Sequence, residues 1–165
     1  MENKLERYWP LSLRILLGIG FLVHGAPKVF SAAGHAGFAG MLQQIGIPAA
    51  GFMAWVVGAV EFFGGVALII GFLTAEASVL LGIDMLVALF TVHLSQGFSF
   101  IHIKGMTPEG TPQFGMPGIE VNLLYLAGLI ALLIGGSGPL SVDERVLRPE
   151  SKVRPPWLRH REVHA

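Results

Sequence analysis

Four long apolar stretches occupy most of this 165-residue chain, and each contains polar or ionisable side chains. About 20 apolar residues in a helix span the roughly 30 Å hydrocarbon core of a bilayer, because each residue adds about 1.5 Å. Unpaired peptide groups are costly in lipid, so long runs without the alternation of barrel strands favour helices. The sequence therefore predicts an all-α integral membrane protein, a four-helix bundle with spans at residues 11–30, 51–73, 77–96 and 119–136.

The composition agrees with a membrane protein. The chain is 53% hydrophobic and only 13% charged, whereas about 25% of the residues of a soluble domain are charged. It has no cysteine, which excludes a disulfide framework, a thiol redox centre, an iron–sulfur cluster and a thiolate zinc site. We expect no metal site and no intrinsic cofactor, so any redox role would depend on a bound molecule.

Basic residues concentrate near the two ends of the chain, and the two longer loops contain only Lys28 and Lys104. Because basic residues favour the cytoplasmic side, the sequence predicts a multi-pass protein with both termini in the cytoplasm. A cleaved signal peptide is the alternative for the N-terminus, since an apolar run follows two basic residues. The basic residues near the ends are Lys4, Arg7, Arg14, Arg145, Arg148, Lys152, Arg154, Arg159 and Arg161.

The connecting segments differ in character. In the first outer loop, Phe38, Met41, Leu42 and Ile45 recur at helical spacing, which predicts a short helix lying along the outer surface. The second outer loop, residues 97–118, is punctuated by glycine and proline and is expected to form an irregular lid over the bundle. The sequence therefore divides into a four-span transmembrane domain, residues 1–140, and a charged cytoplasmic tail, residues 141–165.

An ionisable side chain at mid-bilayer costs at least roughly 2.5–3.5 kcal/mol, so it persists when paired, hydrated or functional. Depth in the membrane predicts a structural ion pair between Arg14 and Asp84 in the inner half. At 100° per residue, His93 lies on the helix face opposite Asp84. Gly58, Glu61 and Gly65 share a helix face that lets another helix approach, which predicts a tight helix contact. Arg14, Gly18, Phe21, Gly25 and Lys28 share one face of the first span.

The outer half of the bundle holds the candidate site, with an expected network of His24, Lys28, Glu61 and Glu120. Glu61, a lone mid-membrane carboxylate, is the best candidate for a catalytic group, although a structural hydrogen bond is an equal alternative. Lys28 has the alternative of reaching the outer headgroups. The two histidines have the alternatives of structural bundle residues and of paired haem ligands. The candidate ligand-binding residues are His24, Lys28, Glu61, His93 and Asn122.

Several blocks of the sequence resemble the DoxX family of bacterial inner-membrane proteins. Asp84 stands where some relatives have a hydrophobic or small residue, whereas Arg14, His24, Lys28 and Glu61 match the family pattern. The blocks are Arg14-Ile-Leu-Leu-Gly18, Phe21-Leu-Val-His24-Gly25-Ala-Pro-Lys28, Gly46-Ile-Pro48, Gly58-Ala-Val-Glu61-Phe-Phe-Gly64-Gly65, Asp84-Met-Leu-Val-Ala88 and Gly138-Pro-Leu-Ser141-Val-Asp143.

The resemblance covers about residues 14–143 and implies a four-helix membrane bundle in the bacterial inner membrane. It also implies an association with redox metabolism, since relatives include a subunit of a quinone-linked oxidoreductase and proteins tied to quinone or oxidative stress. Distant resemblance extends to a eukaryotic cargo receptor, so the fold alone does not settle function.

Three functions remain open on this sequence. The first is a membrane oxidoreductase subunit that binds a quinone or a similar lipophilic molecule between the helices and receives electrons from a redox partner protein. The second is a non-enzymatic membrane scaffold that binds a partner. The third is a small transporter, which at this size would need a homo-oligomer. The lipid bilayer is the expected surrounding in all three, and nucleic acid is not expected as a partner.

Overall fold

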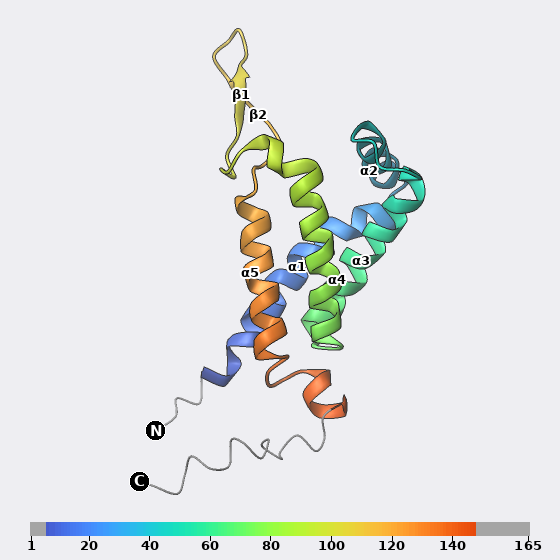
Figure 1. Cartoon of the computed structure of the whole chain (residues 1–165), viewed down its shortest axis with the longest axis vertical. Coiled ribbons are helices and arrows are strands. Elements are labelled where there is room, and N and C mark those ends of the chain that lie inside the picture. Colours follow the sequence, from blue (N-terminus) through green and yellow to red (C-terminus); the bar gives the residue numbers. More distant parts are fainter. Residues whose placement is uncertain (1–5, 148–165) are drawn as a thin grey trace, which may run out of the picture.

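The computed structural model describes residues 6–147 and is mostly helical. Helix α1 follows a short 3₁₀ turn, η1 (Glu6–Tyr8), and a short pairing of strands β1 and β2 separates α4 from α5 (Figure 1). Helix α4 continues without a break into a π-helical segment, η2, and a 3₁₀ turn, η3. The other elements are α1 (Trp9–Phe30), α2 (Ala32–Gln44), α3 (Ala50–Ile70), α4 (Thr74–Ala88), η2 (Leu89–His93), η3 (Leu94–Gln96), β1 (Ile103–Met106), β2 (Pro112–Phe114), α5 (Glu120–Gly135) and η4 (Asp143–Leu147).

Within residues 6–147, three helical segments are long and apolar enough to cross a membrane. They are Trp9–Phe30, Ala50–Ile70 and the continuous segment Thr74–Gln96. The fourth predicted span corresponds to α5, which has only 16 residues and is therefore about 24 Å long. Many large apolar side chains on these helices are exposed, as expected of surfaces that face lipid.

Helices α1 and α3 pack closely through glycines. A Cβ atom added at Gly65 would lie 2.7 Å from the carbonyl oxygen of Gly18, and one added at Gly25 would lie 2.5 Å from the backbone nitrogen of Phe62. Any larger residue would push the helices apart, so the predicted tight contact is confirmed. This contact fixes the register of α1 against α3.

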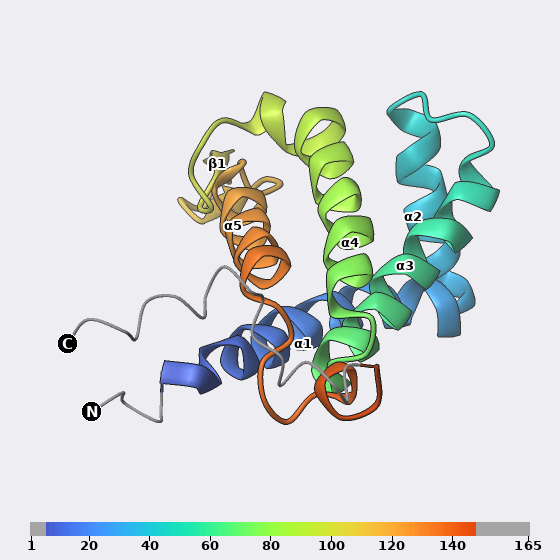
Figure 2. The ribbon, with the colours of Figure 1, turned by 60° about the horizontal axis from the view of Figure 1, so that its bottom comes forward.

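Helices α4 and α5 lie side by side, and α1 crosses them (Figures 1 and 2). The core forms where the helices meet. Helices α1, α3, α4 and α5 contribute apolar side chains that are nearly inaccessible to solvent, and Tyr125 packs at the edge of this core. The central members are Leu17 and Phe21 from α1, Leu68 from α3, Leu81 from α4, and Leu129 and Leu132 from α5.

The sequence predicted one of the two longer loops better than the other. The predicted short helix is present as α2, which packs against α1 and α3. The second loop is not simply irregular, because β1 and β2 form an antiparallel hairpin with Met106 opposite Pro112. The chain reverses at Gly110, whose φ of +81° is readily adopted by glycine. Figure 1 shows this hairpin extending away from the helices rather than covering them.

The first residues of the predicted tail belong to the helical domain. The carboxylate of Asp143 accepts hydrogen bonds from the backbone nitrogens of Leu73 (2.7 Å) and Thr74 (2.9 Å), and so satisfies free N–H groups at the start of α4. Its own backbone nitrogen donates to Gly71 (2.9 Å). The predicted domain boundary after residue 140 cuts through this contact. The rest of the predicted tail, residues 148–165, lies outside the described residues.

Candidate functional site

A cavity of about 470 Å³ lies between the helices and carries most of the polar groups that the sequence singled out. Side chains from α1, α2, α3, α4, η2 and α5 line it, together with residues flanking the hairpin. The structure brings all five candidate ligand-binding residues to its wall, which are His24, Lys28, Glu61, His93 and Asn122.

Lys28 and Glu61 form an ion pair in the cavity wall. The Lys28 ammonium on α1 donates a hydrogen bond to Glu61 Oε2 on α3, and 14% and 7% of the two side chains are exposed. The ammonium also lies 4.2 Å from the centre of the Phe38 ring of α2, a cation–π geometry. Lys28 is therefore held inside the protein rather than extended to headgroups.

The wider network that the sequence predicted around this pair is only partly present. His24 lines the same cavity but is exposed. Glu120 is directed elsewhere, since its Oε2 accepts a hydrogen bond from the backbone nitrogen of Phe100 at 2.8 Å. Glu120 thus holds the loop before the hairpin, and its predicted place in the network is wrong.

The predicted ion pair between Arg14 and Asp84 is also wrong. The fully buried guanidinium of Arg14 donates instead to backbone carbonyl oxygens. The last carbonyls of a helix lack partners within it, and the guanidinium satisfies two of them at the end of α3. The acceptors are Leu68 (2.9 Å), Ile69 (3.0 Å), Ser137 (2.7 Å) and Leu140 (3.2 Å).

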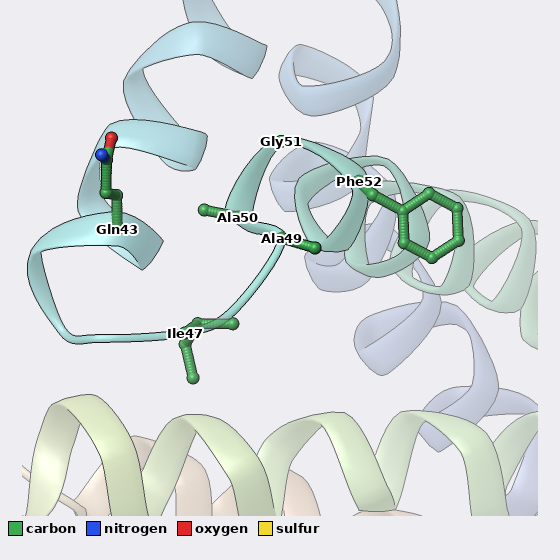
Figure 3. A pocket seen from close by; sticks show the side chains of 6 residues that line it. All are labelled: Gln43, Ile47, Ala49, Ala50, Gly51 and Phe52. Atoms are coloured by element: carbon green, nitrogen blue, oxygen red, sulfur yellow. The ribbon is translucent and has the colours of Figure 1, made fainter.

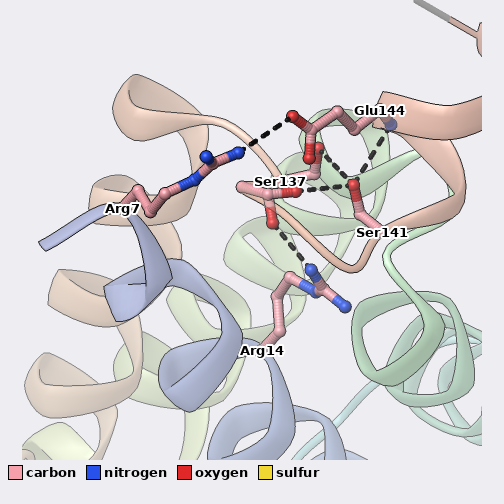
Figure 4. Close-up of polar contacts among 6 residues, drawn as sticks. Arg7, Arg14, Ser137, Ser141 and Glu144 are labelled. Carbon is pink, nitrogen blue, oxygen red and sulfur yellow. Dashed lines mark hydrogen bonds and ion pairs between the residues drawn. The ribbon is translucent and has the colours of Figure 1, made fainter. Parts of the chain in front are cut away.

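Figure 4 shows the surroundings of Arg14 on the side of the segment after α5. Ser141 donates to the hydroxyl of Ser137 (3.1 Å) and accepts from the backbone nitrogen of Glu144 (3.1 Å). Glu144 in turn lies 3.9 Å from Arg7 in an exposed ion pair. Arg14 therefore joins α1, the end of α3 and the segment after α5 into one structural unit.

Asp84 belongs to the cavity instead. It lies on α4 in the cavity wall, and its Oδ2 atom is shielded from water without a hydrogen-bond partner among the residues described. The sequence did not assign Asp84 to the site, because depth in the membrane suggested Arg14 as its partner.

His93 lines the cavity together with Asp84, although an α-helix would place the two residues on opposite faces. The reason is η2, because a π-helical segment bonds i to i+5 and turns less per residue than an α-helix. His93 Nδ1 lies 2.7 Å from the carbonyl oxygen of Pro117. A carbonyl only accepts, so Nδ1 carries the proton. The histidine thereby ties the end of α4 to the loop before α5.

The remaining wall combines one buried amide with aromatic rings. Asn122 Nδ2 donates to the carbonyl oxygen of Met85 at 3.4 Å, which links α5 to α4. Phe21 and Tyr125 meet edge to face, with ring centres 5.1 Å apart. Phe38 and Phe100 also line the cavity. Sequence reasoning missed Tyr125, although its position three residues after Asn122 places it on the same helix face.

Comparison with known proteins places this architecture in a family. The model of the DoxX family matches residues 9–94. The chain belongs to the DoxX family. The predicted family is therefore confirmed, and the matched residues include α1, α3 and the whole of α4, with Lys28, Glu61, Asp84 and His93.

Two relatives of this DoxX protein are named as membrane proteins, and a third carries an enzyme name. The chain is 36% identical to an uncharacterized membrane protein of Mycobacterium tuberculosis, covering 82% of this chain and 80% of the relative. It is 32% identical to "Putative oxidoreductase CatD" of Bacillus subtilis, covering 88% and 92%. It is also 32% identical to "Inner membrane protein YqjF" of Escherichia coli, covering 86% and 94%. No solved structure matches the chain.

A second hollow in this DoxX protein lies where α2 meets the start of α3 (Figure 3). It measures about 420 Å³ and is lined by Gln43, Ile47, Ala49, Ala50, Gly51 and Phe52. None of these side chains is ionisable, so the hollow offers a ligand little beyond apolar contact. The cavity beside Lys28 and Glu61 is the better candidate for a functional site.

Proposed function

We propose that this DoxX protein crosses the bacterial inner membrane four times as a four-helix bundle, with both termini in the cytoplasm. Three helices of span length, the apolar character of α5 and the name of the Escherichia coli relative support this arrangement. A short span is accommodated by local thinning of the bilayer, at fractions of a kcal/mol per Å.

We propose further that the bundle is a redox-associated subunit that binds a quinone or a similar lipophilic molecule in the cavity beside Lys28 and Glu61. The observation that carries this proposal is the composition of the cavity wall. Small-molecule sites are mostly apolar, with a few convergent polar groups, and have volumes of about 300–1,000 Å³. A cavity of about 470 Å³ with aromatic rings and five polar candidates fits this description.

The polar groups suit a molecule with ring oxygens. A quinone carbonyl accepts a hydrogen bond, and the Lys28 ammonium and the His24 ring are donors in the cavity wall. A quinone takes up protons when it is reduced, and the ion pair of Lys28 with Glu61 places a proton carrier at the cavity. Electrons would come from a partner protein or a soluble donor.

The first test identifies what the protein holds when it is purified in mild detergent. Mass spectrometry and visible absorption of the extract should reveal a quinone or another lipophilic ring compound. Glu61→Gln should lower both the amount bound and the tolerance of cells to quinone stress. Glu76→Gln is the matched control, because Glu76 is exposed in the first turn of α4, away from the cavity. Absence of any bound or bindable quinone would refute this function.

A partner-binding scaffold is the second candidate, and the exposed hairpin favours it. The hairpin and its flanks present a group of exposed apolar side chains, namely Phe98, Phe100, Ile101, Ile103, Met106 and Phe114. Exposed apolar patches of this kind often mark interaction sites. Replacing residues 103–114 by a Gly-Ser linker should release a partner from a scaffold, whereas it should leave a ligand in the cavity.

A further inference from the structure

The Asp84 carboxyl group lies in the cavity wall with one oxygen atom whose hydrogen-bonding capacity is unused. Asp84 Oδ2 is shielded from water and has no hydrogen-bond partner in the described part of the chain. Buried polar atoms nearly always have a partner, because leaving one without a hydrogen bond costs free energy. Asp84 also lines the cavity, so the missing partner can come from a molecule bound there.

Most of the polar groups that share the cavity wall already have partners of their own, and neither of the other two, His24 and Tyr125, makes a hydrogen bond to Asp84 Oδ2. Lys28 donates to Glu61, His93 Nδ1 binds the carbonyl oxygen of Pro117, and Asn122 Nδ2 binds that of Met85. The Thr91 hydroxyl donates to Val87 within its own helix, at 2.8 Å. A ligand is therefore the natural source of the hydrogen bond that Asp84 lacks.

The rest of the wall limits the chemistry of that ligand. Phe21, Phe38, Phe100 and Tyr125 line the cavity and offer aromatic surface to a flat ring. A charged ligand would lose its hydration in this mostly apolar wall, which costs free energy. A neutral hydroxyl avoids most of this cost. It both donates and accepts, so it satisfies Asp84 whether or not the carboxyl is protonated.

We propose that Asp84 holds the ring hydroxyl of a phenol-type ligand, such as the reduced form of a quinone. This inference rests on the proposed function, because it names the ligand class for the same cavity. It gives Asp84 a role in binding that differs from that of Glu61, which is neutralised by Lys28. A ring of equal size without a hydroxyl leaves Asp84 unsatisfied and binds more weakly.

The test compares 4-decylphenol with 4-decyltoluene, two probes of nearly equal shape that differ in the hydroxyl. Their dissociation constants are measured by isothermal titration calorimetry for the full-length wild type and for Asp84→Leu, both in the same detergent. Comparing the ratio of the two constants between the proteins cancels the different partitioning of the probes into micelles. The wild type should favour the phenol by about tenfold more than Asp84→Leu does, the value of one net hydrogen bond.

Two further variants make the result specific. Asp84→Asn keeps the shape of the side chain and one acceptor oxygen, so it should retain part of the preference and guards against misfolding of Asp84→Leu. Glu76→Gln changes an exposed side chain of α4 that does not line the cavity, so it should keep the full preference.

The outcomes separate this inference from the function on which it rests. If both probes bind but Asp84→Leu keeps the wild-type preference, the role of Asp84 is refuted while the ligand cavity stands. If neither probe nor a quinone binds the wild type, the proposed function falls and the inference falls with it.

Discussion

Lys28 on α1 and Glu61 on α3 form an ion pair across the close contact of these two helices, beside glycines that let the two backbones approach. A Cβ atom added at Gly58 would lie 2.8 Å from the Cβ atom of Lys28. The same packing that holds the helices together therefore positions the polar wall of the cavity. Stability and site geometry depend on the same residues.

Removing one partner of this pair should destabilise the protein strongly. Lys28→Met leaves the Glu61 carboxylate buried without its cation, which typically costs about 3–5 kcal/mol of unfolding free energy. The double variant with Glu61→Leu should recover much of the loss, because a buried pair can be replaced by apolar groups. Unfolding in detergent measures the free energies of the single and double variants. Simple additivity of the two single losses would contradict a direct pair.

The glycine contact gives a second prediction. Gly65→Ala places a Cβ atom 2.7 Å from the carbonyl oxygen of Gly18, so α1 and α3 must separate, at roughly 1–3 kcal/mol. Gly82→Ala is the matched control within α4, because a Cβ atom there meets nothing within 4 Å. This control should instead stabilise the helix by up to about 1 kcal/mol. Equal effects at both positions would argue against close packing.

Arg14 should stabilise the protein through its hydrogen bonds to backbone carbonyl groups and not through an ion pair with Asp84. Arg14→Met leaves several buried carbonyl oxygens without donors and should lower the unfolding free energy by about 3 kcal/mol or more. Asp84→Leu removes no contact of Arg14 and should leave the melting temperature nearly unchanged. An ion pair between the two residues would instead make both substitutions comparably damaging.

The proposed topology can be tested by labelling single introduced cysteines, because the chain has no native cysteine. Glu109→Cys places a single thiol on the exposed tip of the hairpin, and Arg145→Cys places one on the exposed surface of η4. In spheroplasts, a membrane-impermeant maleimide should label position 109 and leave position 145 unlabelled until the cells are lysed. The reverse pattern would invert the topology.

The sequence predicted those features that depend on the regular period of an α-helix. A tight helix contact at the glycine face of α3 follows from residues spaced three, four or seven apart, and the same spacing together with depth predicted that Lys28 meets Glu61. The family resemblance added the fold and the redox association. Depth along each span also predicted a common location for His24, His93 and Asn122, and all three line one cavity.

The errors have identifiable physical causes. No local pattern marks the change to π geometry at Leu89, which turns His93 toward the cavity that Asp84 also lines. Arg14 could not be paired correctly, because its partners are backbone carbonyls, which every residue carries. The contact of Asp143 with the start of α4 joins positions 69 and 70 residues apart, and no local pattern marks it.

Saturable quinone binding tests the central claim most directly. Decylbenzoquinone is titrated into the purified wild type and into Ala88→Trp, whose indole would fill the cavity, with Ala50→Trp at the second hollow as the control. We predict saturable binding to the wild type and to Ala50→Trp, and none to a folded Ala88→Trp. Equal binding to Ala88→Trp, or no saturable binding to the wild type, would contradict the ligand cavity.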